Sequence, residues 1–528
     1  MAIEEDSGQA PSGRQQPGGP ADTKWWTLAA VCIGTFMLLL DVTIVNVALP
    51  AIQSSLRSTF ADLQWVVDAY ALTLAAFLLT SGSLADMYGR RRLYLIGLVA
   101  FTGASALCGA AQSPLMLELS RGLQGIGGAT MFSVSLALLA SAFEGKERGV
   151  AFGIWGAITG VAVAIGPIVG GALVTGLSWR WIFFVNLPVG ILAIALTFTR
   201  VAESRNEHAR RPDWAGFLLF TTGLAAVIYA LIESGRSSFT NTGVDVSFGL
   251  GGFLLIGFVV VEAKVSHPMF ALGLFRLPTF TGGSIAAFGI SVSIFSVLLY
   301  LTIYLQDVLG YSAFQTGLRL LVLSGGVLAV SGLAGRLTAH VPVRALIGPG
   351  LIAVGVGQFL MRGLNASSGW THLIPGLVVS GIGVGFINPP LASTAVGVVP
   401  PQQSGMASGI NSTFRQVGIS TGIALFGTLF TNRLGTAVTS LSRGTPLAAH
   451  TVAIRQALEN GQVGQLLAQV PAGQRAVLAH VARGGFASAL DAILLVSGIL
   501  AMASGVVAFL LIRTKDFNSA AARGAAAH

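Results

Sequence analysis

Runs of about twenty apolar residues recur along this chain, and they constrain its fold more than any other feature. A helix needs about 20 such residues to cross the hydrocarbon of a bilayer. That length predicts about fourteen spans, with limits good to about 2–4 residues. The predicted spans are 25–51, 63–84, 93–111, 115–141, 149–175, 181–199, 214–233, 247–264, 280–305, 314–337, 345–363, 372–397, 405–431 and 487–512.

Composition supports an integral membrane protein. Of the 528 residues, 53% are hydrophobic and only 10% are charged, and the mean hydropathy is +0.76. A soluble fold of this length does not need so much apolar surface, because its exterior must meet water. The 68 glycines suit close approach between helices in a membrane.

The net charge of +9 does not indicate a nucleic-acid partner, because the basic residues stand in short connections between apolar runs. With the N-terminus in the cytoplasm, the short inside connections hold thirteen Lys and Arg against four outside. The positive-inside rule therefore places both termini in the cytoplasm of a multi-pass protein of the cell membrane. Residues 1–24 and 513–528 are predicted to be cytoplasmic tails, the first of them disordered.

Metals and disulfides are not expected. Cys32 and Cys108 both fall inside apolar spans, and the seven His are scattered without ligand spacing. No cofactor is predicted either. An ATP-driven pump is excluded because the chain has no G-x-x-x-x-G-K-[ST] phosphate loop.

The connection between the second and third spans carries a distinctive motif, GSLADMYGRRRLYLIG at 82–97. Gly82 and Gly89 are predicted to allow tight turns and close approach. Asp86 is expected to accept hydrogen bonds from helix N-termini or to pair with Arg90 or Arg91.

This pattern, G-x-L-x-D-x-x-G-R-R, resembles the signature loop of the major facilitator superfamily. Further runs resemble its drug:proton antiporters with fourteen spans. They are LDVTIVNVALP (40–50), LELSRGLQGIGGA (117–129), GIWGAITGVAVAIGPIVGGAL (153–173) and WRWIFFVNLPVG (179–190). Together the resemblance covers about residues 25–512.

Two positions and one loop depart from the family pattern. Ala162 replaces the second glycine of the antiporter motif, and Met87 stands where a basic residue is common. The matching loop of the second half, 331–348, has no acidic residue. The first-half loop is therefore the better candidate for a gate.

The resemblance implies an all-α fold of two six-helix bundles plus two extra spans. The N-terminal bundle is 25–199, the cytoplasmic linker 200–213, the extra pair 214–264 and the C-terminal bundle 280–512. Within the last, 432–486 is predicted to be a long outside loop carrying small surface helices. Resembling proteins suggest that one chain suffices for function.

Two charged residues lie deep in predicted spans of the first half. Asp41 stands about 14 Å and Arg121 about 10 Å along their helices from the outer surface, so they can meet if both face one cavity. Gln124, Gly125 and Gly128 follow Arg121 on one helix face. The resemblance implies that Arg121 takes part in proton coupling. A structural hydrogen bond of Asp41 and outward snorkelling of Arg121 remain the alternatives.

Other candidates are weaker. Arg415 lies near mid-membrane in the thirteenth span and needs a partner there, which makes it functional or part of a structural contact. Asp68 either lines the cavity or only reaches water. In the fifth span, small residues are predicted to thin one surface, with a bend at the proline: Gly153, Ala162, Gly166, Pro167, Gly170 and Gly171. The family resemblance implies that this surface lies between the halves.

These features favour a secondary transporter that exports small hydrophobic, often cationic drugs or antibiotics in exchange for protons. An ionised Asp41 would attract such cations. The alternative is a proton-coupled importer or an exporter dedicated to a single metabolite. An enzyme is not indicated, because no nucleophile–base arrangement follows from the spacings.

Overall fold

The computed structural model describes residues 21–58, 60–205, 213–237, 242–265, 270, 272–338, 340–399, 403–459, 466 and 470–517. Most of the predicted N-terminal tail, much of the linker and the end of the C-terminal tail lie outside these residues. The described residues are almost entirely helical and contain no strand. The predicted all-α membrane fold is confirmed.

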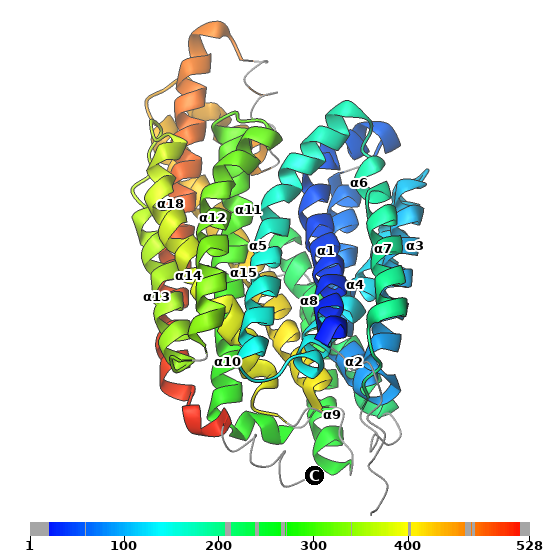
Figure 1. Cartoon of the computed structure of the whole chain (residues 1–528). Coiled ribbons are helices and arrows are strands. Elements are labelled where there is room, and N and C mark those ends of the chain that lie inside the picture. The colour runs from blue at the N-terminus through cyan, green and yellow to red at the C-terminus, as the bar shows by residue number, and fades with distance from the viewer. Residues whose placement is uncertain are drawn as a thin grey trace, which may run out of the picture.

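The N-terminal bundle consists of six long helical segments that stand side by side (Figure 1). They are α1 Ala21–Leu56, α2 Phe60–Tyr88, α3 Arg90–Gly109, α4 Pro114–Ala142, α5 Gly145–Gly176, and the pair α6 Trp181–Phe184 and α7 Asn186–Arg200. A Ser113 side chain caps α4 by accepting from the backbone N–H of Met116 at 3.3 Å, and a proline opens the helix.

A helical hairpin follows, formed by α8 Trp214–Ser237 and α9 Thr242–Lys264. Its aromatic side chains join a cluster with residues of α2 and α15, which belong to different bundles. The extra pair therefore lies at the junction of the two bundles.

The C-terminal bundle repeats the six-segment plan. Its segments are α10 Pro278–Ile290 continuing through η2 Ser291–Phe295, α11 Ser296–Ile303 and η3 Tyr304–Val308; α12 Ala313–Leu337; α13 Arg344–Leu360; α14 Ile374–Val396; α15 Ser404–Ser442; and α18 Ala472–Leu511. The short helices η1 Leu272–Arg276, η4 Trp370–Leu373, η6 Ala448–His450 and α16 Thr451–Glu459 lie in the connections. The predicted ninth span thus corresponds to one unbroken helical segment, in which η2 and η3 are π-helical turns.

Eleven helices of the described residues are long and apolar enough to cross a membrane, and Arg344–Leu360 is a shorter apolar one. The remaining long helices, α5 and α15, have 32 and 39 residues. The chain is therefore a multi-pass membrane protein, and the number of fourteen crossings stays a prediction.

The predicted outside loop 432–486 is shorter in the structure. Helix α15 continues to Ser442, and α18 already begins at Ala472. The first part of α18 projects beyond the rest of the molecule (orange in Figure 1). Buried apolar residues hold these extensions together, Leu434 and Val438 on α15 with Leu478 and Val481 on α18. Both helices continue past the predicted span limits, because a polar segment outside the membrane can keep its helical backbone hydrogen bonds.

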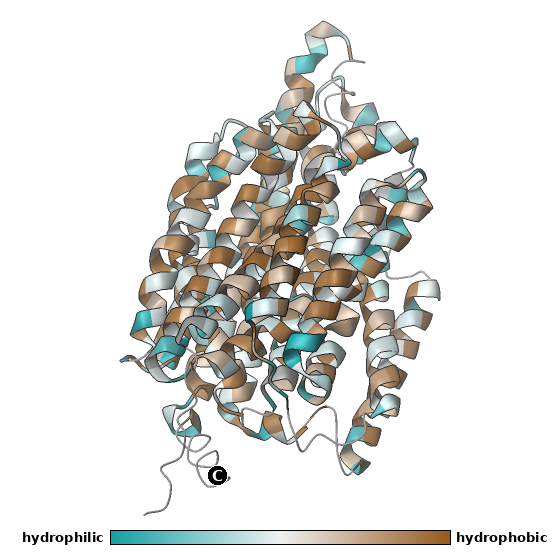
Figure 2. Ribbon diagram, turned by 45° about the vertical axis from the view of Figure 1, so that its right-hand side comes forward, coloured by the Kyte–Doolittle hydropathy of each residue, from teal (hydrophilic) through white to brown (hydrophobic). Residues whose placement is uncertain are grey.

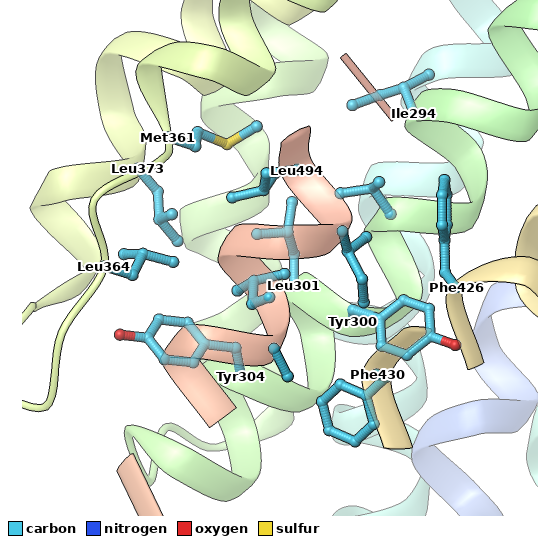
Figure 3. Close-up of a cluster of buried hydrophobic side chains, with 14 of the residues drawn as sticks. Ile294, Tyr300, Leu301, Tyr304, Met361, Leu364, Leu373, Phe426, Phe430 and Leu494 are labelled. Atoms are coloured by element: carbon cyan, nitrogen blue, oxygen red, sulfur yellow. The ribbon is translucent and has the colours of Figure 1, made fainter. Parts of the chain in front are cut away.

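Apolar residues cover the outside of the bundle as well as its core. Brown, hydrophobic positions run along the outer helix faces in Figure 2. The side chains of Phe253, Leu119 and Leu510 are more than 65% exposed. Inside the C-terminal bundle, Figure 3 shows Tyr300, Tyr304, Phe426 and Phe430 packed among leucines of the neighbouring helices. A lipid environment explains why the outside of the bundle is apolar as well as its core.

The end of the bundle that holds the α2–α3 turn is called the inner end below, because the positive-inside rule predicts that it faces the cytoplasm. Helix α1 begins at this end, and the described part of the chain also finishes there (Figure 1).

Candidate functional site

A cluster of polar side chains lies inside the N-terminal bundle, centred on Asp41 of α1. Its Oδ2 accepts a hydrogen bond from Nη1 of Arg121 on α4 at 2.5 Å. Its Oδ1 accepts from Nε2 of Gln124 and from Nδ2 of Asn186, both at 2.9 Å. Asp41 is 0% and Arg121 1% exposed. The meeting expected from their depths therefore occurs, within one bundle and shielded from solvent.

Arg121 is held on several sides. Its Nε donates to the carbonyl of Val66 at 3.1 Å, and its Nη1 also donates to Oε1 of Gln124 at 2.7 Å. Its guanidinium lies 4.2 Å from the ring centroid of Tyr70, a cation–π distance. These contacts exclude the outward snorkelling that the sequence left open.

Two members of the cluster were not predicted from the sequence. Asn186 stands at the start of α7, and Ser105 of α3 accepts from Gln124 at 2.6 Å and from Asn186 at 3.2 Å. Asn186 lies in the family-like run 179–190, so its polarity inside a predicted span was the available signal. Ser105 gave no signal, because serine is common in membrane helices.

The glycines that follow Arg121 allow α4 to lie close to α2. A Cβ added at Gly125 would lie 2.2 Å from Oγ1 of Thr73, and one at Gly128 would lie 3.1 Å from Oη of Tyr70. Glycine at both positions brings Tyr70 over Arg121. The small face on this helix thus positions the charge cluster.

The charges of the Asp41 cluster balance each other. The Asp41 and Arg121 charges neutralise each other in a dry site, and breaking a buried pair by removing one charge is strongly unfavourable. Protonation of Asp41 would leave the Arg121 cation without a counter-charge, so the helices around it must rearrange or admit water.

A second polar site joins the two bundles at the inner end. Oδ1 of Asp86 accepts from Nε and Nη2 of Arg90, at 3.0 and 2.8 Å. Oδ2 of the same carboxylate accepts from the backbone N–H of Met406 at 2.9 Å, in the first turn of α15. A carboxylate at a helix N-terminus is stabilised by the helix dipole. Asp86 therefore links the signature loop to the opposite bundle at the inner end.

Arg91 does not share this contact. Its Nη2 donates to the carbonyl of Phe198 at 2.5 Å on α7, and the half-buried Arg91 stays within the N-terminal bundle. Of the two predicted partners of Asp86, the structure selects Arg90.

The turn itself depends on one glycine. Gly89 has φ 107°, and a Cβ there would lie 2.7 Å from Cδ of Glu203. The Glu203 carboxylate accepts from the backbone N–H groups of Arg91 and Arg92 at 3.0 and 3.1 Å, which caps α3. The predicted tight turn at Gly82 is not formed, because Gly82 lies buried inside α2.

The small residues of α5 form two packing faces. Gly153 faces α12, where an added Cβ would lie 3.2 Å from the carbonyl of Ser331. Gly166 and Gly170 face α1 instead, and a Cβ at Gly166 would lie 1.8 Å from Oγ1 of Thr43. Ala162 is fully buried and Gly171 is half-buried.

The prediction of a single thinned surface on α5 was therefore wrong. At about 100° per residue, the direction of Gly166 and Gly170 differs from that of Gly153, Gly156 and Gly160 by roughly 90°. The glycines of the inner half of α5 face the C-terminal bundle, whereas Gly166 and Gly170 of the outer half face α1. The outer half also contacts the C-terminal bundle through Ile168, which lies against Gly317 of α12. Pro167 stands in the outer half, and α5 continues through it to Gly176.

The other two charged candidates lie elsewhere. Arg415 on α15 is half-buried, and its Nη2 donates to Oδ1 of Asn388 on α14 at 3.2 Å. Asp68 is half-buried on α2, and the described hydrogen bonds of the Asp41 cluster do not include it. The structure thus brings Asp41 and Arg121 together and leaves Arg415 in the other bundle.

The family model of the Major Facilitator Superfamily matches residues 31–423 of the chain. This match includes the Asp41 cluster, the Asp86 contact and both faces of α5. The chain belongs to the major facilitator superfamily. It is accordingly a membrane transporter.

Proteins of known role in the superfamily are similar over most of their length. Multidrug resistance protein Stp of Mycobacterium tuberculosis is 40% identical over 77% of this chain and 76% of its own. The puromycin resistance protein pur8 of Streptomyces alboniger is 36% identical over 85% of this chain and 90% of its own. The tetracenomycin C resistance and export protein of Streptomyces glaucescens is 30% identical over 93% and 94%.

Solved structures support the same fold. The proton:xylose symporter XylE superposes with a TM-score of 0.63 at 11% identity, over 94% of this chain and 99% of the other. The human organic anion transporter MFSD10 gives 0.62 at 13% identity, over 94% and 100%. At such identities the likeness concerns the fold alone.

Proposed function

We propose that this transporter is a proton-coupled antiporter, which exports small hydrophobic drugs or antibiotics from the cytoplasm by alternating access. The carrying observation is the buried Asp41–Arg121 pair with its Gln124 and Asn186 donors. Multidrug and antibiotic resistance proteins among the relatives support the cargo class. One chain in the cell membrane, with both termini in the cytoplasm, is proposed to be sufficient.

The proposed cycle uses the two polar sites in turn. A proton arriving from outside neutralises Asp41 and releases its hold on Arg121. The bundles then rock, the Asp86–Met406 contact opens, and the inner end admits cargo. Loss of the proton to the cytoplasm restores the buried pair and closes the inner end again.

Asp41 has no role in binding cargo in this proposal. Its carboxylate is 0% exposed and its oxygens accept from three donors, so an ionised Asp41 does not present a surface to a cationic drug. Its role is restricted to the proton.

Everted membrane vesicles with an acid-inside pH gradient test the proposal. Lipophilic cations, neutral compounds and acids are added in turn, and a pH-sensitive dye reports collapse of the gradient. Collapse is expected with the native chain and not with Asp41→Asn. The matched control is Asp245→Asn, which removes an exposed carboxylate from the first turn of α9 and should behave as the native chain.

The outcomes separate the parts of the proposal. Gradient collapse by Asp41→Asn at the native rate would remove Asp41 from coupling. Absence of collapse with every compound would refute drug antiport, while the fold and family would stand.

A further inference from the structure

Arg415 is a cation without a balancing carboxylate in the described part of the chain. Its described polar partner is the neutral amide of Asn388, at 3.2 Å, and it takes part in none of the described ion pairs. An arginine in a membrane bundle is costly and normally pairs with a carboxylate or with backbone carbonyls. Arg121 in the other bundle follows that rule, since it meets Asp41 at 2.5 Å.

The position of Arg415 is central. It stands eleven residues after Ser404, the first residue of α15, which is about 16 Å along the helix from the inner end. Its partner Asn388 lies against the N-terminal bundle, because a Cβ at Gly156 of α5 would be 3.5 Å from Cβ of Asn388. Arg415 is thus tethered to a residue at the boundary between the bundles.

A cavity of about 410 Å³ lies at the inner end, beside the helix α14 that carries Asn388. It is lined by residues of α5, of the α12–α13 turn, of α14 and of the chain end after α18, and its lining includes Pro389, the neighbour of Asn388. Neither Arg415 nor any other residue of α15 lines this cavity, so a ligand must pass beyond Pro389 to reach the guanidinium. Arg148, His340 and Arg344 are among the lining residues, and no Asp or Glu is. Arg344 and His340 are exposed at this end.

The positive-inside rule accounts for arginines at the inner edge of the bundle, where they meet anionic headgroups. It does not account for Arg415, which is deeper. The carboxylate of Asp41 cannot balance Arg415, because Arg121, Gln124 and Asn186 already occupy its oxygens.

The guanidinium of Arg415 is suited to an acidic ligand. It has five N–H donors in a planar fork, and the bond to Asn388 uses one of them and fixes its orientation. Such a fork binds a carboxylate or sulfonate through two parallel hydrogen bonds. Arg415 also repels a cationic ligand from the same place.

We propose that the cargo of this transporter is a hydrophobic organic acid, which approaches through the inner cavity and is held by the Arg415 guanidinium beside Asn388. This rests on the proposed export function and makes its cargo more specific. The acid supplies the negative charge that Arg415 lacks, and the apolar remainder of the cargo contacts the surrounding helices. Arg148, His340 and Arg344 draw the acid to the cavity mouth.

Three fluorescent probes of one shape test the charge preference: 9-anthracenecarboxylate, its carboxamide, and (9-anthrylmethyl)trimethylammonium. Binding to the purified full chain is followed by probe anisotropy at constant salt. The carboxylate is expected to bind at least tenfold more tightly than the other two. In Arg415→Gln the three affinities should fall within about threefold of one another, whereas Arg415→Lys should keep part of the preference.

A matched control removes the same charge from the same helix. Arg433 is exposed at the outer end of α15, so Arg433→Gln should leave all three affinities unchanged. Arg344→Gln should slow association of the carboxylate a few-fold, and this difference should shrink at high salt. Thermal unfolding of each variant shows that it is folded.

Equal binding of the three probes to the native chain, tighter binding of the cation, or an unchanged preference in Arg415→Gln overturns the inference. So does failure of all three probes to bind. If neutral compounds still collapse the vesicle pH gradient in that case, the proposed export function survives without the acid cargo. If the acid binds through Arg415 but moves no proton, the coupling fails and the site stands.

Discussion

The two bundles treat a buried arginine in opposite ways. In the N-terminal bundle, Arg121 is sealed from solvent and balanced by Asp41, with two amides completing the hydrogen bonds. In the C-terminal bundle, Arg415 is half-buried and meets one neutral amide. A balanced pair responds to a proton, because adding one removes the balance. An unbalanced cation responds to an anion, because the bound anion balances its charge.

The largest expected effect is the difference in stability between variants of the two arginines. Arg121→Gln leaves the Asp41 charge buried without its cation, which should lower the free energy of unfolding by about 3–5 kcal/mol. Arg415→Gln keeps a donor for Asn388 and should change the free energy of unfolding by less than about 1 kcal/mol. Urea or thermal unfolding of both purified variants in one detergent measures the difference. Equal losses would contradict the contrast between the bundles.

The double variant Asp41→Asn/Arg121→Gln makes the same comparison sharper. It removes both charges, so much of the stability lost in Arg121→Gln should return. A double-mutant cycle gives the coupling between the two side chains. Strictly additive losses would show that the two charges do not act as a pair.

The contact between the bundles should have the next largest effect. Asp86→Asn removes the charge that receives the N–H of Met406 and the Arg90 guanidinium, a loss of about 1.5–3 kcal/mol for hydrogen bonds to a charged group. The inner end should open more often. Ser408 is fully buried there, so a cysteine at Ser408→Cys should react with a permeant maleimide about tenfold faster in the Asp86→Asn background. Unchanged reactivity would remove Asp86 from gating.

Removal of one amide tests how far the Asp41 cluster depends on its neutral members. Asn186→Ala deletes one of the two donors to Oδ1 of Asp41 and should cost about 1–2 kcal/mol of stability. In the vesicle assay, the rate at which added compounds collapse the pH gradient should fall less in Asn186→Ala than in Asp41→Asn. A complete loss of coupling with native stability would make Asn186 part of the proton path.

The smallest expected effect is at the cap of α3. Glu203→Gln keeps the acceptor oxygen but removes the charge at an exposed helix N-terminus, which should cost about 0.3–1 kcal/mol. The loss should diminish in high salt, because exposed charges are screened. Unfolding at two salt concentrations checks this. A salt-independent loss would show that packing around Gly89, and not charge, holds the turn.

The sequence by itself determined the membrane class, the helical fold and the family, since these depend on local periodicity and on contiguous motifs. Apolar length predicts a span wherever it occurs, and the signature loop is read within ten residues. The same local signals marked Asp41, Arg121 and Asp86, because charge inside or beside a span is costly unless it is used.

Only the tertiary structure decided the partners. The sequence placed Arg415 in the same functional set as Asp41, whereas the fold puts it in another bundle beside Asn388. It added Asn186 and Ser105 to the Asp41 cluster, chose Arg90 for Asp86, and divided the α5 glycines between two neighbours. Apart from the Asp86–Arg90 pair, which lies within four residues, these contacts depend on which helices face one another. No local pattern carries that information, since the contacting residues are tens of positions or more apart.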